Sequence, residues 1–230
     1  MGKTDSENQK VKSRNINRNV NSSTGSNLNG DDVNRTIVLP ILKCLYTNAD
    51  QFTNKITELI VRVRDKKLDI IEITEVKPKN SRYKPHLAEY SLTEVGNYKM
   101  FWKNLEKDNG RGLLLYINKE LNGNEVQMES NFEENLFVQI KLNNNDKLLI
   151  GIIYRSPSER SIEHNSRLRE LLVEASNKGL THILIKGDFN YPDIDWVNYN
   201  SRGDKTDSPE YKFVMVFGFL FRLEFFFRTT

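Results

Sequence analysis

The feature that most constrains the fold is a strand, a helix and a second strand within a short stretch. The apolar, partly β-branched run "TIVLPILKCLYTNA", beginning near Ile37, predicts a buried strand. Apolar residues at helical spacing then predict an amphipathic helix over residues 51–66, and "LDIIEIT" predicts a strand that stops at Glu75. Such a unit, about 35 residues long, is a crossover, which implies parallel or mixed pairing in an α/β sheet.

The middle of the chain predicts more strands, joined by short turns. Turn-forming clusters such as "EKDNGRG" and "LNNND" interrupt five apolar segments: "YKMFW", "GLLLYI", "NEVQM", "LFVQIKL" and "KLLIGIIY". This pattern is typical of antiparallel hairpins. A second amphipathic helix is predicted over residues 161–178, with Ser161 as its N-cap, and "HILIK" is the strand after it. The whole predicts a layered α/β protein with helices covering a sheet.

Composition bounds the compartment and the number of domains. The 34 basic and 31 acidic residues leave a net charge of only +3, so charge alone does not indicate a nucleic-acid binder. A lone cysteine, Cys44, and a polar start without signal-peptide character favour an intracellular protein, nuclear or cytoplasmic, without a membrane partner. Residues 1–35, poor in large apolar side chains, predict a disordered polar tail before one domain, 36–230. There is no repeat, Gly-rich phosphate loop or zinc-type Cys/His spacing.

Polar side chains follow four apolar strands at the point where each strand ends. They are Asn48, Glu75, Tyr154 and the pair Asp188 and Asn190. In open α/β sheets, ligands gather outside the carboxyl ends of the strands, so these groups are expected to face one place. Oxygen ligands of this kind suit Mg²⁺, which takes one or two carboxylates and leaves other positions to water and phosphate. The pattern favours metal-assisted phosphoryl transfer.

Each of these residues also has an ordinary structural interpretation. Asn48 is a common turn residue at a strand end, Glu75 fits a surface acid, and Tyr154 fits a core aromatic residue with a satisfied hydroxyl. The tetrapeptide "GDFN" is a natural turn, because Asp and Asn bond their own backbone and Gly tolerates unusual angles. The order and spacing of all four strand ends together favour a site.

The segments "TNADQFTNKITELI", "LDIIEITE", "GLLLYI", "LIGIIYRSP" and "ILIKGDFNYPDIDW" resemble the endonuclease/exonuclease/phosphatase (DNase I-like) superfamily. Within it, residues 41–221 look most like the apurinic-type endonuclease domain of non-long-terminal-repeat (non-LTR) retrotransposons. The resemblance implies a four-layered α/β sandwich, with two mixed sheets face to face and helices outside. It also implies hydrolysis of DNA phosphodiesters with Mg²⁺, or Mn²⁺, as cofactor.

The resemblance assigns roles to the strand-end residues. Glu75 would be the main metal ligand, and Asn48 would help to position the metal or the phosphate. Tyr154 would meet the scissile phosphate, Asn190 would hydrogen-bond it, and Asp188 would orient or activate the attacking water. These roles agree with a mechanism in which a cation neutralises charge while a carboxylate positions the nucleophile.

One part of the family pattern does not occur in this sequence. The family completes its site with a later Asp and then a Ser-Asp-His strand whose His is the acid/base, and the chain contains no Ser-Asp-His. Its histidines, His86, His164 and His182, are expected to be ordinary structural or surface residues. The last segment, "PEYKFVMVFGFLFRLEFFFRTT", begins like the family's next helix and ends in a phenylalanine cluster. We interpret it as a truncated end, with the last strands of the sandwich missing.

The sequence therefore leaves three functional hypotheses. The first is the DNA-nicking endonuclease of a non-LTR retrotransposon, lacking the reverse transcriptase portion and expected to be inactive or nearly so. The second is a catalytically dead domain that binds nucleic acid or protein. The third keeps the superfamily and changes the substrate to a phosphoinositide or another lipid phosphodiester, which "YRSP" and "DIDW" argue against. Cleavage-site preference and oligomeric state do not follow from the sequence.

Overall fold

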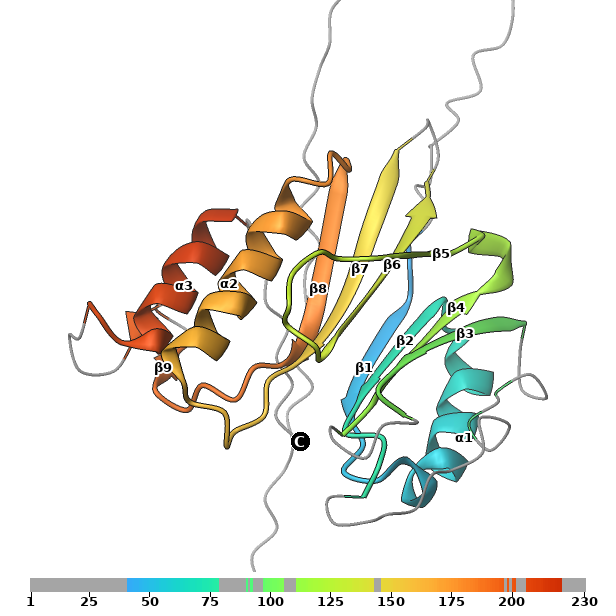
Figure 1. Cartoon of the computed structure of the whole chain (residues 1–230). Helices are drawn as coiled ribbons and strands as arrows, with labels where there is room; N and C mark the ends of the chain where they lie inside the picture. The colour runs from blue at the N-terminus through green and yellow to red at the C-terminus, as the bar shows by residue number, and fades with distance from the viewer. Residues whose placement is uncertain are drawn as a thin grey trace, which may run out of the picture. The chain divides into compact units, whose positions relative to one another are not determined.

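In the computed structural model, two four-stranded sheets lie face to face and helices cover their outer faces (Figure 1). The residues that the structure describes are 41–78, 90, 92, 97–105, 111–142, 146–196, 198, 200–201 and 206–220. The predicted tail over 1–35, His86 and the phenylalanine cluster over 225–227 lie outside these ranges.

The first sheet contains the predicted crossover. Its strand order is β1-β2-β4-β3, and its members are β1 (Cys44–Asn48), β2 (Ile70–Thr74), β4 (Leu113–Asn118) and β3 (Tyr98–Lys103). β1 and β2 pair in parallel, as predicted, while β2–β4 and β3–β4 are antiparallel. The connection between β1 and β2 is a short 3₁₀ turn, η1 (Phe52–Asn54), followed by α1 (Ile56–Lys66).

Two predicted boundaries in this sheet need correction. The helix predicted over 51–66 is divided at Lys55, and Gln51 before it has a φ of 87°, so the first turn is 3₁₀ rather than α-helical. The first strand begins at Cys44, and the predicted start at Ile37 lies outside the described residues. The residues of β1 are only partly buried because β1 is an edge strand. Just before it, the Asp69 carboxylate accepts the Lys43 backbone N–H at 2.8 Å.

The second sheet is built mainly from hairpins and ends in another parallel pair. Its order is β5-β6-β7-β8, with β5 (Asn124–Val126), β6 (Asn135–Lys141), β7 (Lys147–Tyr154) and β8 (His182–Asp188). β7 and β8 run parallel and are connected by α2 (Ile162–Ser176), which Ser161 caps by accepting the His164 backbone N–H at 3.1 Å. The chain continues through the short pair β9 (Ile194–Asp195) and β10 (Asn200–Ser201) to α3 (Pro209–Leu220).

Three hydrophobic clusters correspond to the three interfaces between layers. One joins α1 to the first sheet, one fills the space between the sheets, and one joins α2 and α3 to the second sheet. In the last of these, Phe213 of α3 stacks on Phe217, with ring centroids 5.1 Å apart, and also contacts Phe189. The predicted four-layered α/β sandwich with two mixed sheets is confirmed.

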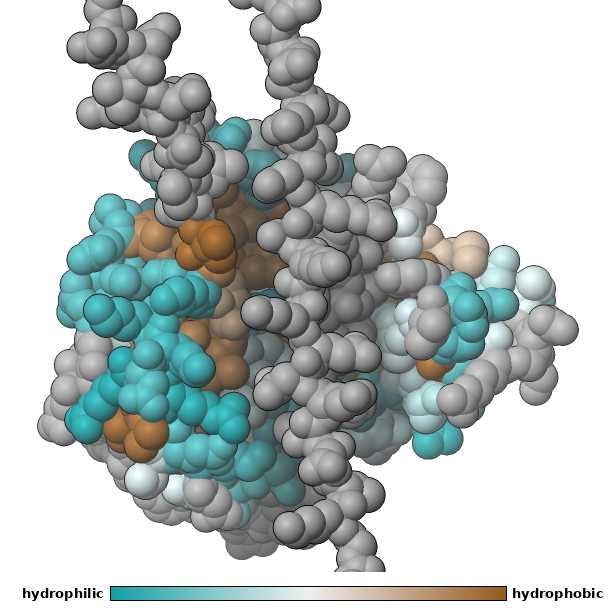
Figure 2. Space-filling model, turned by 180° about the vertical axis from the view of Figure 1, so that it is seen from behind, coloured by the Kyte–Doolittle hydropathy of each residue, from teal (hydrophilic) through white to brown (hydrophobic). Residues whose placement is uncertain are grey.

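Some large hydrophobic side chains are exposed on the surface of the described part of the chain. On the face turned away in Figure 1, hydrophobic side chains show between hydrophilic ones (Figure 2). The most exposed large apolar residues, Ile41 and Ile162, lie on different segments, as scattered surface residues do. Within the described ranges, no helix combines the length and the apolar character needed to cross a membrane.

Candidate active site

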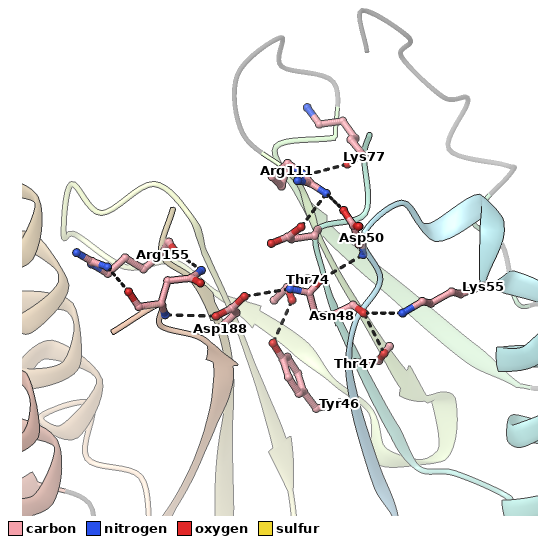
Figure 3. A network of polar contacts seen from close by, with 12 residues as sticks. Tyr46, Thr47, Asn48, Asp50, Lys55, Thr74, Lys77, Arg111, Arg155 and Asp188 are labelled. Atoms are coloured by element: carbon pink, nitrogen blue, oxygen red, sulfur yellow. Dashed lines mark hydrogen bonds and ion pairs between the residues drawn. The ribbon is translucent and has the colours of Figure 1, made fainter. Parts of the chain in front are cut away.

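The strand ends meet where the edge strands of the two sheets face each other. Asn48 is the last residue of β1 and Asp188 is the last residue of β8. The Asn48 side-chain amide donates to Asp188 Oδ2 at 3.0 Å, across 140 residues of sequence (Figure 3). The Asn48 Oδ1 atom accepts the Asp50 backbone N–H at 3.0 Å, so both ends of this amide are held. One hydrogen bond thus joins the two sheets and aims a carboxylate at their common edge.

Glu75 and Tyr154 complete this edge from the neighbouring strands. Glu75 follows β2 directly, with a φ of 52°, and its Oε2 atom lies 2.7 Å from Nη2 of Arg111. The same Nη2 atom lies 2.8 Å from Oδ1 of Asp50. Tyr154 ends β7 beside Asp188, its partner in the register between β7 and β8. Backbone strain gathers here, since Asp50, Glu75 and Asn190 are non-glycine residues with positive φ.

A buried network holds the turn after Asp188. The Arg155 and Asn190 residues bind each other reciprocally: the Arg155 guanidinium donates to Asn190 O at 2.8 Å, and Asn190 Nδ2 donates to Arg155 O at 2.7 Å. The Arg155 guanidinium also donates to Asn165 Oδ1 at 3.2 Å and lies 4.0 Å from the Tyr191 ring centroid. Asn165 Oδ1 accepts the Tyr191 hydroxyl as well. The loop that carries Asn190 is therefore fastened to α2 and β7.

Replacing Asn165 by alanine should destabilise the fold by about 2 kcal/mol, because it leaves the buried Arg155 Nε and Tyr191 hydroxyl without their acceptor. The measurement is the urea midpoint of unfolding. Ser166→Ala, the next position on α2, removes only a hydrogen bond to exposed Glu170 and should change stability by less than about 0.5 kcal/mol. Equal midpoints for the two variants would show that the network contributes nothing.

Burial raises the pKa of two groups at this edge, Asp188 and Tyr154. It raises the pKa of Asp188 above the ordinary carboxyl value, and the Glu75 charge adds to this, while the hydrogen bonds from Asn48 and Asn190 oppose it. Burial likewise raises the pKa of Tyr154 far above its usual range, an effect that Glu75 reinforces and Arg111 reduces. The Tyr154 hydroxyl therefore stays protonated at neutral pH and is a hydrogen-bond donor.

The donor set suits a hard cation rather than a zinc-type centre. Glu75 and Asp188 supply carboxylate oxygens, and each is partly open to solvent. Among the described residues, no group of three or more His, Cys, Asp and Glu side chains could hold a metal ion. Because Mg²⁺ keeps several waters and needs only one or two carboxylates from the protein, the residues present fit this ion.

All five predicted strand-end residues lie at the same edge of the sandwich. The structure adds residues that the sequence patterns did not single out as functional: Asp50, Arg111, Arg155 and Asn165. Their only sequence signal was position, since Arg111 lies within the predicted turn "EKDNGRG" and Arg155 stands within "YRSP". The described histidines lie elsewhere: His164 packs on Phe132 with ring centroids 4.9 Å apart, and His182 begins β8 at the end opposite Asp188.

Comparisons with known proteins agree with this architecture. No family model and no curated protein sequence matches the chain. Among solved structures, it is similar to the endonuclease domain of TRAS1, a telomere-specific non-LTR retrotransposon, with a TM-score of 0.51, 13% identity and coverage of 78% of this chain and 71% of that one. It is also similar to the catalytic domain of APE2 from Xenopus laevis, with a TM-score of 0.50, 11% identity and coverage of 76% and 67%. These likenesses confirm the predicted fold of the endonuclease/exonuclease/phosphatase superfamily.

Proposed function

We propose that this chain is a metal-dependent phosphodiesterase domain that nicks DNA, of the kind found in non-LTR retrotransposons. The observation that carries the proposal is the Asn48–Asp188 hydrogen bond, which joins the two sheets and brings the strand ends together. The fold that this chain shares with the TRAS1 endonuclease domain supports DNA as the substrate class.

In this proposal, each residue at the edge has one task. Glu75 would hold Mg²⁺ or Mn²⁺, and Asn48 would help to position the metal or the phosphate. When bound, the metal would neutralise the charge that builds on the phosphate. Tyr154 donates its hydroxyl to a phosphate oxygen, and Asn190 binds the phosphate through the part of its side chain that Arg155 does not occupy.

Asp188 orients the attacking water and accepts its proton. Its raised pKa makes it a stronger base than an ordinary carboxylate, and the Asn48 hydrogen bond leaves Oδ1 facing the Asn190 backbone N–H at 3.3 Å. No histidine among the described residues stands at this edge to protonate the leaving oxygen. The sequence also contains no Ser-Asp-His segment, from which the resembled family draws its general acid. Losing a general acid typically lowers the rate about 10²- to 10⁴-fold, so we propose a slow enzyme.

A plasmid-nicking assay of the full 230-residue chain, followed over hours with Mg²⁺ or Mn²⁺, tests the proposal. We expect slow nicking that EDTA abolishes and that Asp188→Asn reduces about tenfold or more. Asp193→Asn, an exposed acid in the same loop, is the matched control and should keep the activity of the parent chain.

Three results would contradict parts of this proposal. Nicking that persists in Asp188→Asn would remove Asp188 from the mechanism. DNA binding without any metal-dependent nicking would favour a domain that only binds nucleic acid. Competition by phosphoinositide vesicles that exceeds competition by duplex DNA would move the substrate to lipid phosphodiesters.

A further inference from the structure

Arg111 is a cation fixed inside the candidate active site. Its Nε atom donates to the Lys77 backbone carbonyl at 3.0 Å, and its Nη2 atom lies between the carboxylates of Glu75 and Asp50, at 2.7 and 2.8 Å. Only 13% of its side chain is exposed. Gly112, which follows at a φ of 75°, turns the chain into β4 directly after it. The guanidinium is therefore held by two carboxylates and one backbone carbonyl, beside the proposed metal ligand Glu75 (Figure 3).

The guanidinium and a divalent cation need the same carboxylate. In the structure, Glu75 Oε2 is engaged by Arg111, and Glu75 is the residue proposed to hold the metal. Two cations that share one partly buried carboxylate repel each other, because screening by solvent is reduced there. Metal binding at Glu75 therefore costs part of the Glu75–Arg111 ion pair and is weaker than the carboxylate alone would allow.

We infer that Arg111 is a further catalytic residue, a built-in cation that contacts the scissile phosphate and lowers the affinity of Glu75 for the metal. This inference rests on the proposed function. Arg111 is paired with Glu75, the residue proposed to hold the metal, and its charge lowers the pKa of Tyr154, so it is close enough to act on both groups. Its planar fork of N–H donors matches phosphate oxygens, which makes arginine suited to bind a phosphate where a carboxylate partner is taken by metal.

The exposed Asp50 explains how the guanidinium can leave Glu75 and remain in place. The Asp50 side chain is 81% exposed, whereas that of Glu75 is 14% exposed. When the Glu75 oxygen is taken, Arg111 keeps its contacts with Asp50 and the Lys77 carbonyl. The side chain thus stays at the site with donors released for the substrate.

The test compares Arg111→Met with the unmodified 230-residue chain in two binding measurements. Mn²⁺ affinity is measured without DNA, by the electron paramagnetic resonance signal of the free ion. Affinity for a short DNA duplex is measured by fluorescence anisotropy in saturating Ca²⁺. We expect Arg111→Met to bind Mn²⁺ about tenfold more tightly, because a repelling charge is gone, and DNA about fivefold more weakly, because a phosphate contact is lost.

These opposite changes separate a phosphate-binding arginine from a merely structural one. Arg62→Met is the matched control, since it removes an exposed ion pair with Glu58 on α1 (N–O 2.6 Å), and it should change neither affinity. Unchanged Mn²⁺ affinity in Arg111→Met, or a fall in both affinities, would overturn the inference while leaving the proposed function intact. Mn²⁺ binding that survives in Glu75→Gln, or no Mn²⁺ binding by either folded protein, would overturn the proposed metal position and this inference with it.

Discussion

Gly187→Ala should strongly destabilise the folded chain. Gly187 lies within β8, opposite Ile153 of β7, and a Cβ added to it would lie 1.9 Å from the Ile153 carbonyl oxygen and 2.8 Å from its carbonyl carbon. Contacts under 3.0 Å essentially never occur for real Cβ atoms, and this neighbour is backbone, which no rotamer change can move. The edge strand β8 would have to move away from β7 near the end that carries Asp188. We expect a loss of more than about 4 kcal/mol, from a total stability of roughly 5–15 kcal/mol.

Urea unfolding followed by circular dichroism measures this effect, and a second glycine supplies the control. Gly218 lies in α3, and a Cβ added there would meet nothing within 4 Å. Gly218→Ala should therefore raise the unfolding free energy by about 0.5–1 kcal/mol, because alanine loses less backbone entropy in a helix. A midpoint for Gly187→Ala within the range of the unmodified chain would show that β7 and β8 tolerate the extra carbon and that the close approach is unimportant.

Gly187 also shows which parts of the site were predictable from the sequence. The strand ends were predictable because apolar periodicity stops where polar residues begin, and all five strand-end residues lie at one edge. The alternative interpretation of "GDFN" was an ordinary turn, whereas Gly187 and Asp188 belong to β8 and Asn190 has the left-handed conformation. Glycine is needed at position 187 because the Ile153 backbone of the neighbouring strand lies so close. The residues around Gly187 in the sequence do not indicate how close that strand comes.

Contacts between distant segments could not be predicted for the same reason. Arg111 and Asp50 are 61 residues apart, and no periodicity links them. The acid within "LDIIEIT" was counted only as part of an apolar strand, yet Glu72 is fully buried between the sheets. Its side chain shares a face of β2 with Thr74, whose hydroxyl bonds that of Tyr46 at 3.1 Å. A column of polar groups thus extends below the site into the core.

Glu72 and Lys186 form the charged part of this column. Lys186 Nζ lies 2.9 Å from Glu72 Oε2, and the Glu72 side chain has no solvent exposure, whereas that of Lys186 has 26%. Neither Glu72 oxygen has a well-formed hydrogen bond from any residue that the structure describes. The ion pair is therefore the main compensation for burying this carboxylate, and burial raises the pKa of Glu72 although Lys186 opposes the rise.

Lys186→Met should destabilise the chain by about 3–5 kcal/mol at pH 7, because it leaves a buried carboxylate without its counter-charge. Removing Lys186 also takes away an influence that lowers the pKa of Glu72, so the folded-state pKa rises further above its unfolded value. Folding then favours the protonated acid. The contribution of Glu72 to the free energy of unfolding is greatest below the pKa that Glu72 has in the unfolded chain. This contribution is lost as the pH rises toward the pKa that Glu72 has in the folded chain. The deficit of the variant relative to the unmodified chain should therefore shrink between pH 7 and pH 5, by at most about 1.4 kcal/mol per pH unit.

Lys178→Met makes the decisive control, since Lys178 is as exposed as Lys186, at 27% against 26%, and pairs with Glu174 at 2.7 Å. Glu174 also accepts the backbone N–H groups of Glu129 and Ser130, so its carboxylate stays hydrogen-bonded when the lysine is removed. This variant should lose less than about 1 kcal/mol, with no recovery at pH 5. The double variant Glu72→Leu with Lys186→Met removes both charges and should regain most of the loss. If Lys186→Met and Lys178→Met unfold alike at both pH values, the buried pair contributes no more than a surface one, and Glu72 must be folded in its protonated form already.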